Sequence, residues 1–177
     1  MKKFSDIINE WKYDDKSNVD PYLHPKTKQE LIEILADRLR VNIEEPNMSF
    51  IDTSAITDMS NIFTASGQQP LRKLKLMPNR IKKLDLSGWD VSNVIKMDNM
   101  FFMCTSLEEI VGIDKWNVEK LESCQSMFYD CYTLYKMNIN NWNIQKDTNT
   151  TCMFQDCNYY SIPKWYNTET QKVDFKK

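Results

Sequence analysis

The densest local charge in the sequence is a run of bases between residues 71 and 86, LRKLKLMPNRIKKLDL. The run contains no acid before Asp85. Its six bases are Arg72, Lys73, Lys75, Arg80, Lys82 and Lys83. Such a cluster can bind an acidic protein surface, or nucleic-acid phosphates that each add a salt-dependent term to the affinity. It can also be a solvated edge that keeps sheets from associating. The six bases are therefore candidate binding residues, with these three interpretations open.

The cysteines and the single histidine form no recognisable catalytic or metal motif. Cys104, Cys131 and Cys157 lie far from His24 and no C-x-x-C occurs, which disfavours zinc. We predict that the three thiols are buried in a repetitive core, with a disulfide or redox role as the alternative. The sequence has no P-loop, G-x-S-x-G, H-E-x-x-H or G-x-G-x-x-G, and only three glycines. We expect no enzymatic activity, no cofactor and no metal.

Three blocks of the sequence align with one another without a gap. They are WDVSNVIKMDNMFFMC from Trp89, WNVEKLESCQSMFYDC from Trp116 and WNIQKDTNTTCMFQDC from Trp142. A diverged copy, IDTSAITDMSNIFTAS, begins at Ile51. Repetition at about 26 residues is typical of stacked structural units. We therefore predict four stacked turns of chain, called coils below, whose equivalent tryptophans form a ladder in the core.

Two periodicities alternate along each coil. An L-x-x-L-x-L segment precedes the Trp, and the spacing of Leu84 and Leu86 predicts a short strand. Inside the block, Met97, Met100 and Phe101 continue a spacing of three and four that predicts a short helix. The basic run carries two L-x-x-L-x-L segments around MPNR, residues 77–80, where we predict a hairpin turn.

The unit W-[DN]-[VI]-x-x-[VL]-x-x-[MC]-x-x-[MI]-F, followed by L-x-x-L-x-L, resembles the BspA-like leucine-rich repeats of bacterial surface proteins. The closest stretch is LSGWDVSNVIKMDNMF, residues 86–101, and the resemblance covers roughly residues 50–160. It implies a solenoid and a protein-binding role, and the family has no shared catalytic residues. We expect an α/β, leucine-rich-repeat-like, right-handed solenoid of about four coils, with short parallel strands, short helices and an N-terminal helical cap.

The terminal coils of such a stack need covers. Thr27 and Glu30 form a capping box before an apolar stripe, which predicts a helix of about 13 residues ending near Arg40. A further short helix is predicted around Phe4 to Trp11.

The chain is thus divided into three predicted parts. Residues 1–46 form the N-terminal helical cap, residues 47–160 form the repeats with a basic insertion at 67–80, and residues 161–177 form a C-terminal cap or tail. Trp165 and Tyr166 are expected to cover the last coil.

Composition narrows the class of protein. A chain of 177 residues with 41% hydrophobic residues fits one globular domain, and a net charge of -2 gives no long-range field toward nucleic acid or membrane. Polar residues interrupt the N-terminal stretch and no apolar run is long enough to span a bilayer, so we expect a cytoplasmic protein.

We therefore predict a non-enzymatic protein-protein interaction module that binds a macromolecular partner as a monomer, through the coil surface and the six bases. One such role is that of an intracellular bacterial or phage-encoded inhibitor of a host or defence protein. The alternatives are a structural component of a virion or assembly, and a nucleic-acid-binding protein acting through residues 72–83.

Overall fold

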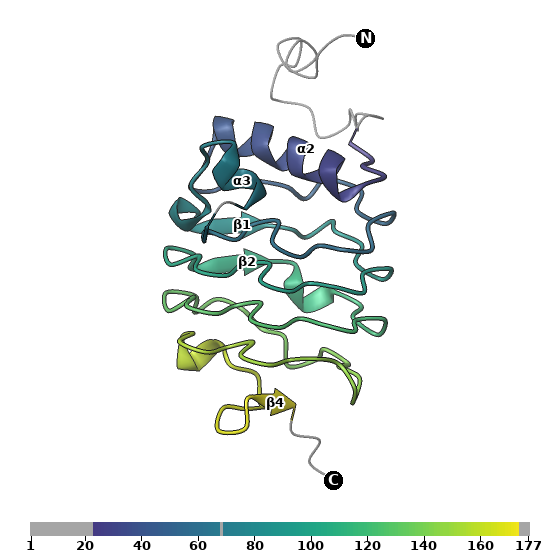
Figure 1. Cartoon of the computed structure of the whole chain (residues 1–177), viewed down its shortest axis with the longest axis vertical. Helices are drawn as coiled ribbons and strands as arrows, with labels where there is room; N and C mark the ends of the chain where they lie inside the picture. Colours follow the sequence, from purple (N-terminus) through teal and green to yellow (C-terminus); the bar gives the residue numbers. More distant parts are fainter. Residues whose placement is uncertain (1–22, 68, 174–177) are drawn as a thin grey trace.

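The protein is described by a computed structural model that covers residues 23–67 and 69–173. These residues form a column of stacked turns of chain, with helix α2 at one end and strand β4 at the other (Figure 1). The elements in chain order are α2 (Lys28–Val41), α3 (Pro70–Lys73), η1 (Pro78–Arg80), β1 (Lys83–Asp85), β2 (Glu109–Val111), η2 (Ile113–Lys115), η3 (Tyr159–Ser161), β3 (Tyr166–Asn167) and β4 (Lys172–Val173). The short helix predicted around Phe4 to Trp11 lies outside the described residues.

Helix α2 forms where the sequence predicts it. The Thr27 side chain accepts a hydrogen bond from the Glu30 N–H at 3.2 Å, as an N-cap should. The Glu30 carboxylate in turn accepts from the Lys26 N–H at 2.7 Å, one residue earlier than in a capping box. Leu31 and Leu35 are fully buried. The helix thus closes the apolar end of the column.

A parallel ladder runs down one side of the column. Strands β1 and β2 pair in parallel, with Lys83 opposite Glu109 and Asp85 opposite Val111. Single parallel bridges extend the ladder on both sides, from Asn47 to Asp85 and from Glu109 to Lys136. The L-x-x-L-x-L strands are therefore formed in the two central coils and shortened to single bridges in the outer ones.

The short helices predicted inside the blocks are wrong. The corresponding residues form successive turns, and alternate N–H groups donate to the next coil rather than along their own chain. In the second coil, at 2.8 to 2.9 Å, the donors Met97, Asn99, Phe101 and Met103 bond the carbonyl oxygens of Ser123, Gln125, Met127 and Tyr129. Because every second N–H bonds a neighbouring coil, the backbone cannot form the continuous i to i−4 hydrogen bonds of a helix.

Tight turns explain why the apolar spacing resembles that of a helix. The Met100 N–H donates to the Met97 oxygen at 3.2 Å, so a turn brings residues three apart onto the same side. Asn99 and Met103 adopt left-handed φ values of 54° and 60°, which no α-helix accommodates. The period of three therefore arises from repeated turns.

The core consists of columns of identical side chains, one from each coil. Trp89, Trp116 and Trp142 stack with ring centroids 6.3 and 6.0 Å apart, and each is 5% exposed. A second column stacks at 5.4 to 5.5 Å and consists of Phe63, Phe101, Phe128 and Phe154. The predicted tryptophan ladder is confirmed.

The last phenylalanine is closed by the chain that follows it. Trp165 and Tyr166 meet the Phe154 ring edge-on, with centroids 6.2 and 4.9 Å away. Burial raises the pKa of Tyr166 to about 12, against the lowering effect of hydrogen bonds from the Phe154 and Met153 backbone. These two aromatic side chains cover the last coil, as the sequence predicts.

All five cysteines are free thiols. Cys104 and Cys131 are buried as predicted, and their sulfurs donate to the carbonyl oxygens of Phe63 and Phe101 at 3.2 and 3.1 Å. Cys157 is half-buried, and burial raises its pKa to about 12. The ladder positions therefore hold thiols that pack and hydrogen-bond individually.

The hairpin predicted around residues 77–80 is not formed. Pro70 begins the single turn of α3, and Pro78 begins η1, because proline suits the first position of a helical turn. The N–H groups of Lys82 and Lys83 donate to the Glu44 oxygen at 2.7 and 3.1 Å. The second L-x-x-L-x-L segment therefore pairs with the chain after α2, and not with the first segment.

Candidate functional site

Three of the six predicted binding residues form ion pairs with acids from other parts of the fold. The Lys82 Nζ lies 2.8 Å from the Glu44 carboxylate, and Arg80 lies 3.7 Å from the same group. The hydrogen bond and charge of Lys82 lower the pKa of Glu44. Lys83 lies 3.4 Å from Glu109. These bases are therefore paired, although no acid is near them in the sequence before Asp85.

The other three bases remain together on the surface. Arg72, Lys73 and Lys75 are exposed, and within the described chain no ion pair joins them to an acid. Leu74 and Met77 beside them are 41% and 49% exposed. We call these five residues the basic corner. It combines bases that pair with no acid of the described residues with accessible apolar surface, which is typical of a protein-binding surface.

The end of α3 holds the basic corner in a defined shape. The N–H groups of Lys75 and Leu76 donate to the oxygens of Arg72 and Leu71, at 2.9 and 3.0 Å, in the pattern of a Schellman motif. Lys75 takes the position that is usually glycine, with φ 61°. A lysine there costs about 1 kcal/mol relative to glycine. The corner is thus a fixed turn rather than a loose loop.

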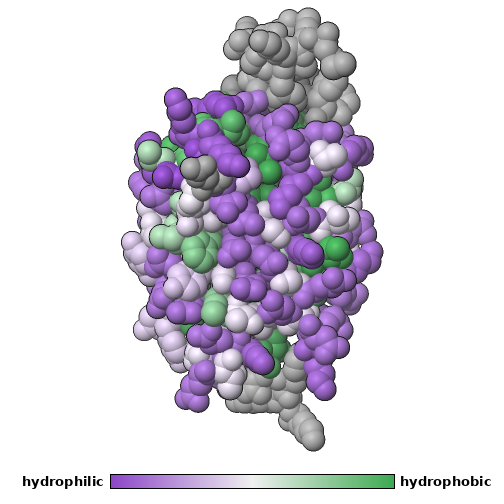
Figure 2. All heavy atoms as spheres, viewed as in Figure 1, coloured by the Kyte–Doolittle hydropathy of each residue, from purple (hydrophilic) through white to green (hydrophobic). Residues whose placement is uncertain are grey.

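On the strand side of the column, side chains of opposite charge on neighbouring coils form ion pairs with one another. Glu109 lies between Lys83 at 3.4 Å and Lys136 at 3.6 Å, so opposite charges alternate from coil to coil. Figure 2 shows one face of the molecule as mostly hydrophilic, with hydrophobic residues scattered over it. Each of the two lysines in this ladder therefore lies beside an acid, which Glu109 supplies to both.

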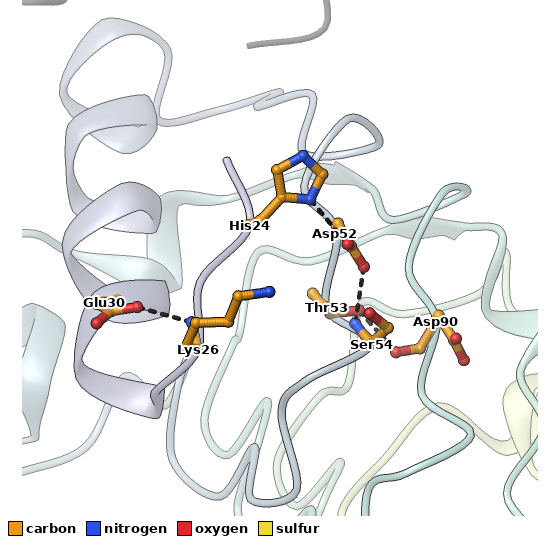
Figure 3. A network of polar contacts seen from close by, with 7 residues as sticks. All are labelled: His24, Lys26, Glu30, Asp52, Thr53, Ser54 and Asp90. Atoms are coloured by element: carbon orange, nitrogen blue, oxygen red, sulfur yellow. Dashed lines mark hydrogen bonds and ion pairs between the residues drawn. The ribbon is translucent and has the colours of Figure 1, made fainter. Parts of the chain in front are cut away.

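A polar network joins the start of the described chain to the first coil (Figure 3). The His24 Nδ1 lies 2.8 Å from an Asp52 oxygen, and the other Asp52 oxygen accepts from the Ser54 N–H at 3.0 Å. Hydrogen bonds from Ser54, and then from His24, lower the pKa of Asp52 to about 2. The second ring nitrogen of His24 points away from the other residues drawn. The network therefore anchors the chain before α2 to the first coil.

A shallow cavity of about 390 Å³ lies at the C-terminal end of the column, where the sequence analysis placed no site. It is lined by Lys146, Asp147, Thr148, Asn149, Thr150, Thr151, Lys172 and Val173. The sequence feature that could have indicated this cavity is the replacement of apolar residues by Asp147 and Thr150 in the last block.

In the ranges 23–67 and 69–173, no group of three potential ligands could hold a metal ion. No helix there is both long and apolar enough to span a membrane.

A family described as "Mycoplasma protein of unknown function, DUF285" matches residues 33–165, three quarters of the chain. The chain belongs to this family. The DUF285 match begins within α2 and ends at Trp165, so it includes all four coils and the basic corner. No curated protein and no solved structure matches the chain.

Proposed function

We propose that this DUF285 protein is a BspA-like, leucine-rich-repeat-like right-handed solenoid that binds another protein and has no enzymatic activity. Two observations support the architecture. Equivalent residues of successive coils stack, as Trp89, Trp116 and Trp142 do. The DUF285 family is also related to BspA-like repeat proteins. Repeat proteins of this kind bind through extended surfaces made by adjacent coils.

The basic corner is the proposed contact surface, and the observation that carries the proposal is that its three bases form no ion pair with residues 23–67 or 69–173. Arg80, Lys82 and Lys83 are held by acids of the fold, whereas Arg72, Lys73 and Lys75 project from a fixed turn beside Leu74 and Met77. An acidic protein surface with an apolar patch complements this arrangement. The partner gains both charge pairing and buried apolar area.

The test compares two triple variants that change net charge equally. One carries Arg72→Glu, Lys73→Glu and Lys75→Glu, and the control reverses three exposed lysines elsewhere, Lys26, Lys115 and Lys120. Wild type and both variants are used for affinity capture from the source cell, and the affinity of each captured protein is then measured with purified components. We expect the corner variant to lose about tenfold or more in affinity while the control keeps it. Equal binding by the corner variant refutes the assignment.

The partner class and the assembly state are tested separately. We propose a monomer that acts in the cytoplasm, for example as an inhibitor of a host or defence protein, because five unpaired thiols suit a reducing compartment. Light scattering that shows large self-assembled particles favours a structural or virion component instead. Binding to single- or double-stranded nucleic acid that falls steeply with salt and is lost in the corner variant favours a nucleic-acid role.

A further inference from the structure

The most exposed aromatic side chains gather at one corner near the C-terminal end of the column. Tyr132 and Tyr135 are 55% and 49% exposed. Tyr159 and Tyr160, which begin η3, are 78% and 88% exposed. The next most exposed aromatic residue in the described part of the chain is Phe50, at 37%. We call the four tyrosines the tyrosine corner.

Hydrogen bonds between adjacent turns of the column place the two pairs of tyrosines beside each other. The Asn158 side-chain amide donates to the Tyr132 carbonyl oxygen at 3.3 Å, and the Ser161 hydroxyl donates to the Leu134 carbonyl oxygen. Residues 158–161 therefore run alongside residues 132–134. The rings of the η3 tyrosines meet edge-on, with centroids 6.1 Å apart and planes at 76°, so their faces point in different directions.

The stacked fold does not require tyrosine at these positions. One coil earlier, the equivalents of Tyr132 and Tyr135 are Thr105 and Glu108. Aromatic surface that stays in water contributes no burial energy, and a contiguous exposed patch of it marks an interaction site. Tyrosine and arginine are among the residues that most often carry binding energy at protein interfaces. The tyrosine corner is therefore a candidate contact surface.

Three acids flank the tyrosine corner. The Glu108 carboxylate accepts a hydrogen bond from the Tyr135 hydroxyl at 3.4 Å. Asp130 and Asp156 occupy the equivalent turns that precede the two pairs of tyrosines, with left-handed φ values of 58° and 57°. Within the described part of the chain, none of the three acids forms an ion pair. The flanking charge therefore favours a cationic partner.

One ring of the tyrosine corner already contacts a cation of the chain itself. The Lys136 Nζ lies 5.5 Å from the centroid of the Tyr135 ring, and the same ammonium lies 3.6 Å from Glu109. The face of a tyrosine ring attracts a cation through its quadrupole. Among the described residues, no base lies over the other three rings of the corner. Those rings are available to a cation from outside the chain.

We propose that the tyrosine corner binds an arginine-bearing segment of a partner protein, whose guanidinium groups stack on the rings and pair with the flanking acids. A guanidinium group is planar, so it can lie against a tyrosine ring while its N–H groups donate to a carboxylate. A phosphate or an acidic peptide would instead be repelled by Glu108, Asp130 and Asp156. The tyrosine corner and the basic corner beside α3 lie toward opposite ends of the column, so each can be tested without the other (Figure 1).

The probe is the blocked pentapeptide acetyl-Gly-Arg-Ser-Arg-Gly-amide, titrated into the isotope-labelled full chain while backbone amide signals are followed by NMR. We expect saturable binding with a Kd of about 1 mM or tighter, with the largest shifts among residues 132–135 and 158–161. The matched control peptide carries citrulline in place of both arginines, which keeps the shape of the side chain and removes its charge. We expect the citrulline peptide to bind about fivefold or more weakly.

A double variant tests the rings. Tyr159→Ser with Tyr160→Ser removes the two most exposed rings, and substitutions at such exposed positions leave the fold stable. Val41→Ser is the control, because it removes a 56% exposed apolar side chain at the other end of the column. We expect the double variant to lose about fivefold or more in affinity for the arginine peptide, and the control to bind like wild type.

A triple variant tests the acids. It carries Glu108→Gln, Asp130→Asn and Asp156→Asn, and asparagine tolerates the left-handed φ of both aspartates. We expect this variant to bind the arginine peptide about threefold or more weakly. The control neutralises three other exposed acids and is expected to bind like wild type: Asp114→Asn, Glu119→Gln and Glu122→Gln.

Several results overturn the proposal. They are the absence of saturable binding by wild type, equal affinity for the arginine and citrulline peptides, and unchanged affinity in the tyrosine double variant or the acid triple variant. A neutral oligosaccharide such as cellotetraose that binds at the same amides more tightly than the arginine peptide assigns the corner to a carbohydrate instead. A dimer seen by light scattering that excludes the peptide, and is lost when Arg72, Lys73 and Lys75 are changed to glutamate, assigns the corner to a second copy of this chain.

Discussion

Phe101 is the most informative single position for testing the stacked core. Its side chain is fully buried, and its ring lies between two others in the phenylalanine column. The Phe63 centroid is 5.5 Å away with planes 5° apart, and the Phe128 centroid is 5.4 Å away with planes 8° apart. The adjacent Phe102 points the other way, is half-buried, and stacks on Tyr129 at 4.8 Å. The two phenylalanines therefore form a matched pair.

The expected costs differ several-fold. Replacing a buried phenylalanine by alanine costs about 3 to 5 kcal/mol of unfolding free energy, depending on how far the surroundings collapse into the cavity. The rings on both sides of Phe101 belong to neighbouring coils. Backbone hydrogen bonds such as that from the Phe101 N–H to the Met127 oxygen at 2.9 Å fix the spacing of these coils, so the surroundings can collapse little into the cavity. We expect Phe101→Ala to cost about 4 to 5 kcal/mol, because both stacked pairs are lost. Phe102→Ala removes one stacked pair, that with Tyr129, at a half-buried position, and should lower the unfolding free energy by about 1 kcal/mol.

Urea unfolding and thermal melting of the three proteins measure these costs. At this chain length 1 kcal/mol corresponds to about 2 to 4 °C, so Phe101→Ala should lower Tm by about 10 to 20 °C and Phe102→Ala by a few degrees. Equal m-values are required for the comparison to be valid. If Phe102→Ala destabilises as much as Phe101→Ala, the alternation of inward and outward side chains along the turns is wrong.

Three further predictions follow from the same contacts. Met127→Asp places an unpaired charge at a position that is 0% exposed, so it should cost several kcal/mol and leave the chain unfolded by circular dichroism. Asp52 has a pKa of about 2 in the folded protein against an ordinary value of 3.8, so its stabilising contribution is present above about pH 4 and is lost as the pH falls toward 2. Melting should therefore distinguish Asp52→Asn from wild type at pH 6, and the difference should shrink as the pH falls through 3 and vanish only below about pH 2; a difference that does not shrink over this range contradicts the anchoring role. Burial raises the pKa of the Cys104, Cys124 and Cys131 thiols, so these should resist maleimide in the native state while half-exposed Cys152 reacts first, as peptide mass spectrometry can show.

The repeat frame in the sequence was sufficient to predict which side chains touch. Trp89, Trp116 and Trp142 occur at nearly constant spacing, and identical residues on successive turns of a stack must lie over one another. Helix α2 could also be predicted from the sequence, because Thr27 and the apolar stripe after it are local signals. These features depend only on residue spacing and local propensity, which the sequence contains directly.

Tertiary structure decided the features that depend on a partner distant in the chain. The apolar spacing of Met97, Met100 and Phe101 suits a helix as well as a series of turns, and hydrogen bonds to the next coil select the turns. Glu44 pairs with Lys82, which lies 38 positions later in the sequence, and such pairs reduce the six-base cluster to the basic corner. Backbone pairing and charge compensation act through space between residues of different coils, so neither could be assigned before those coils were placed side by side.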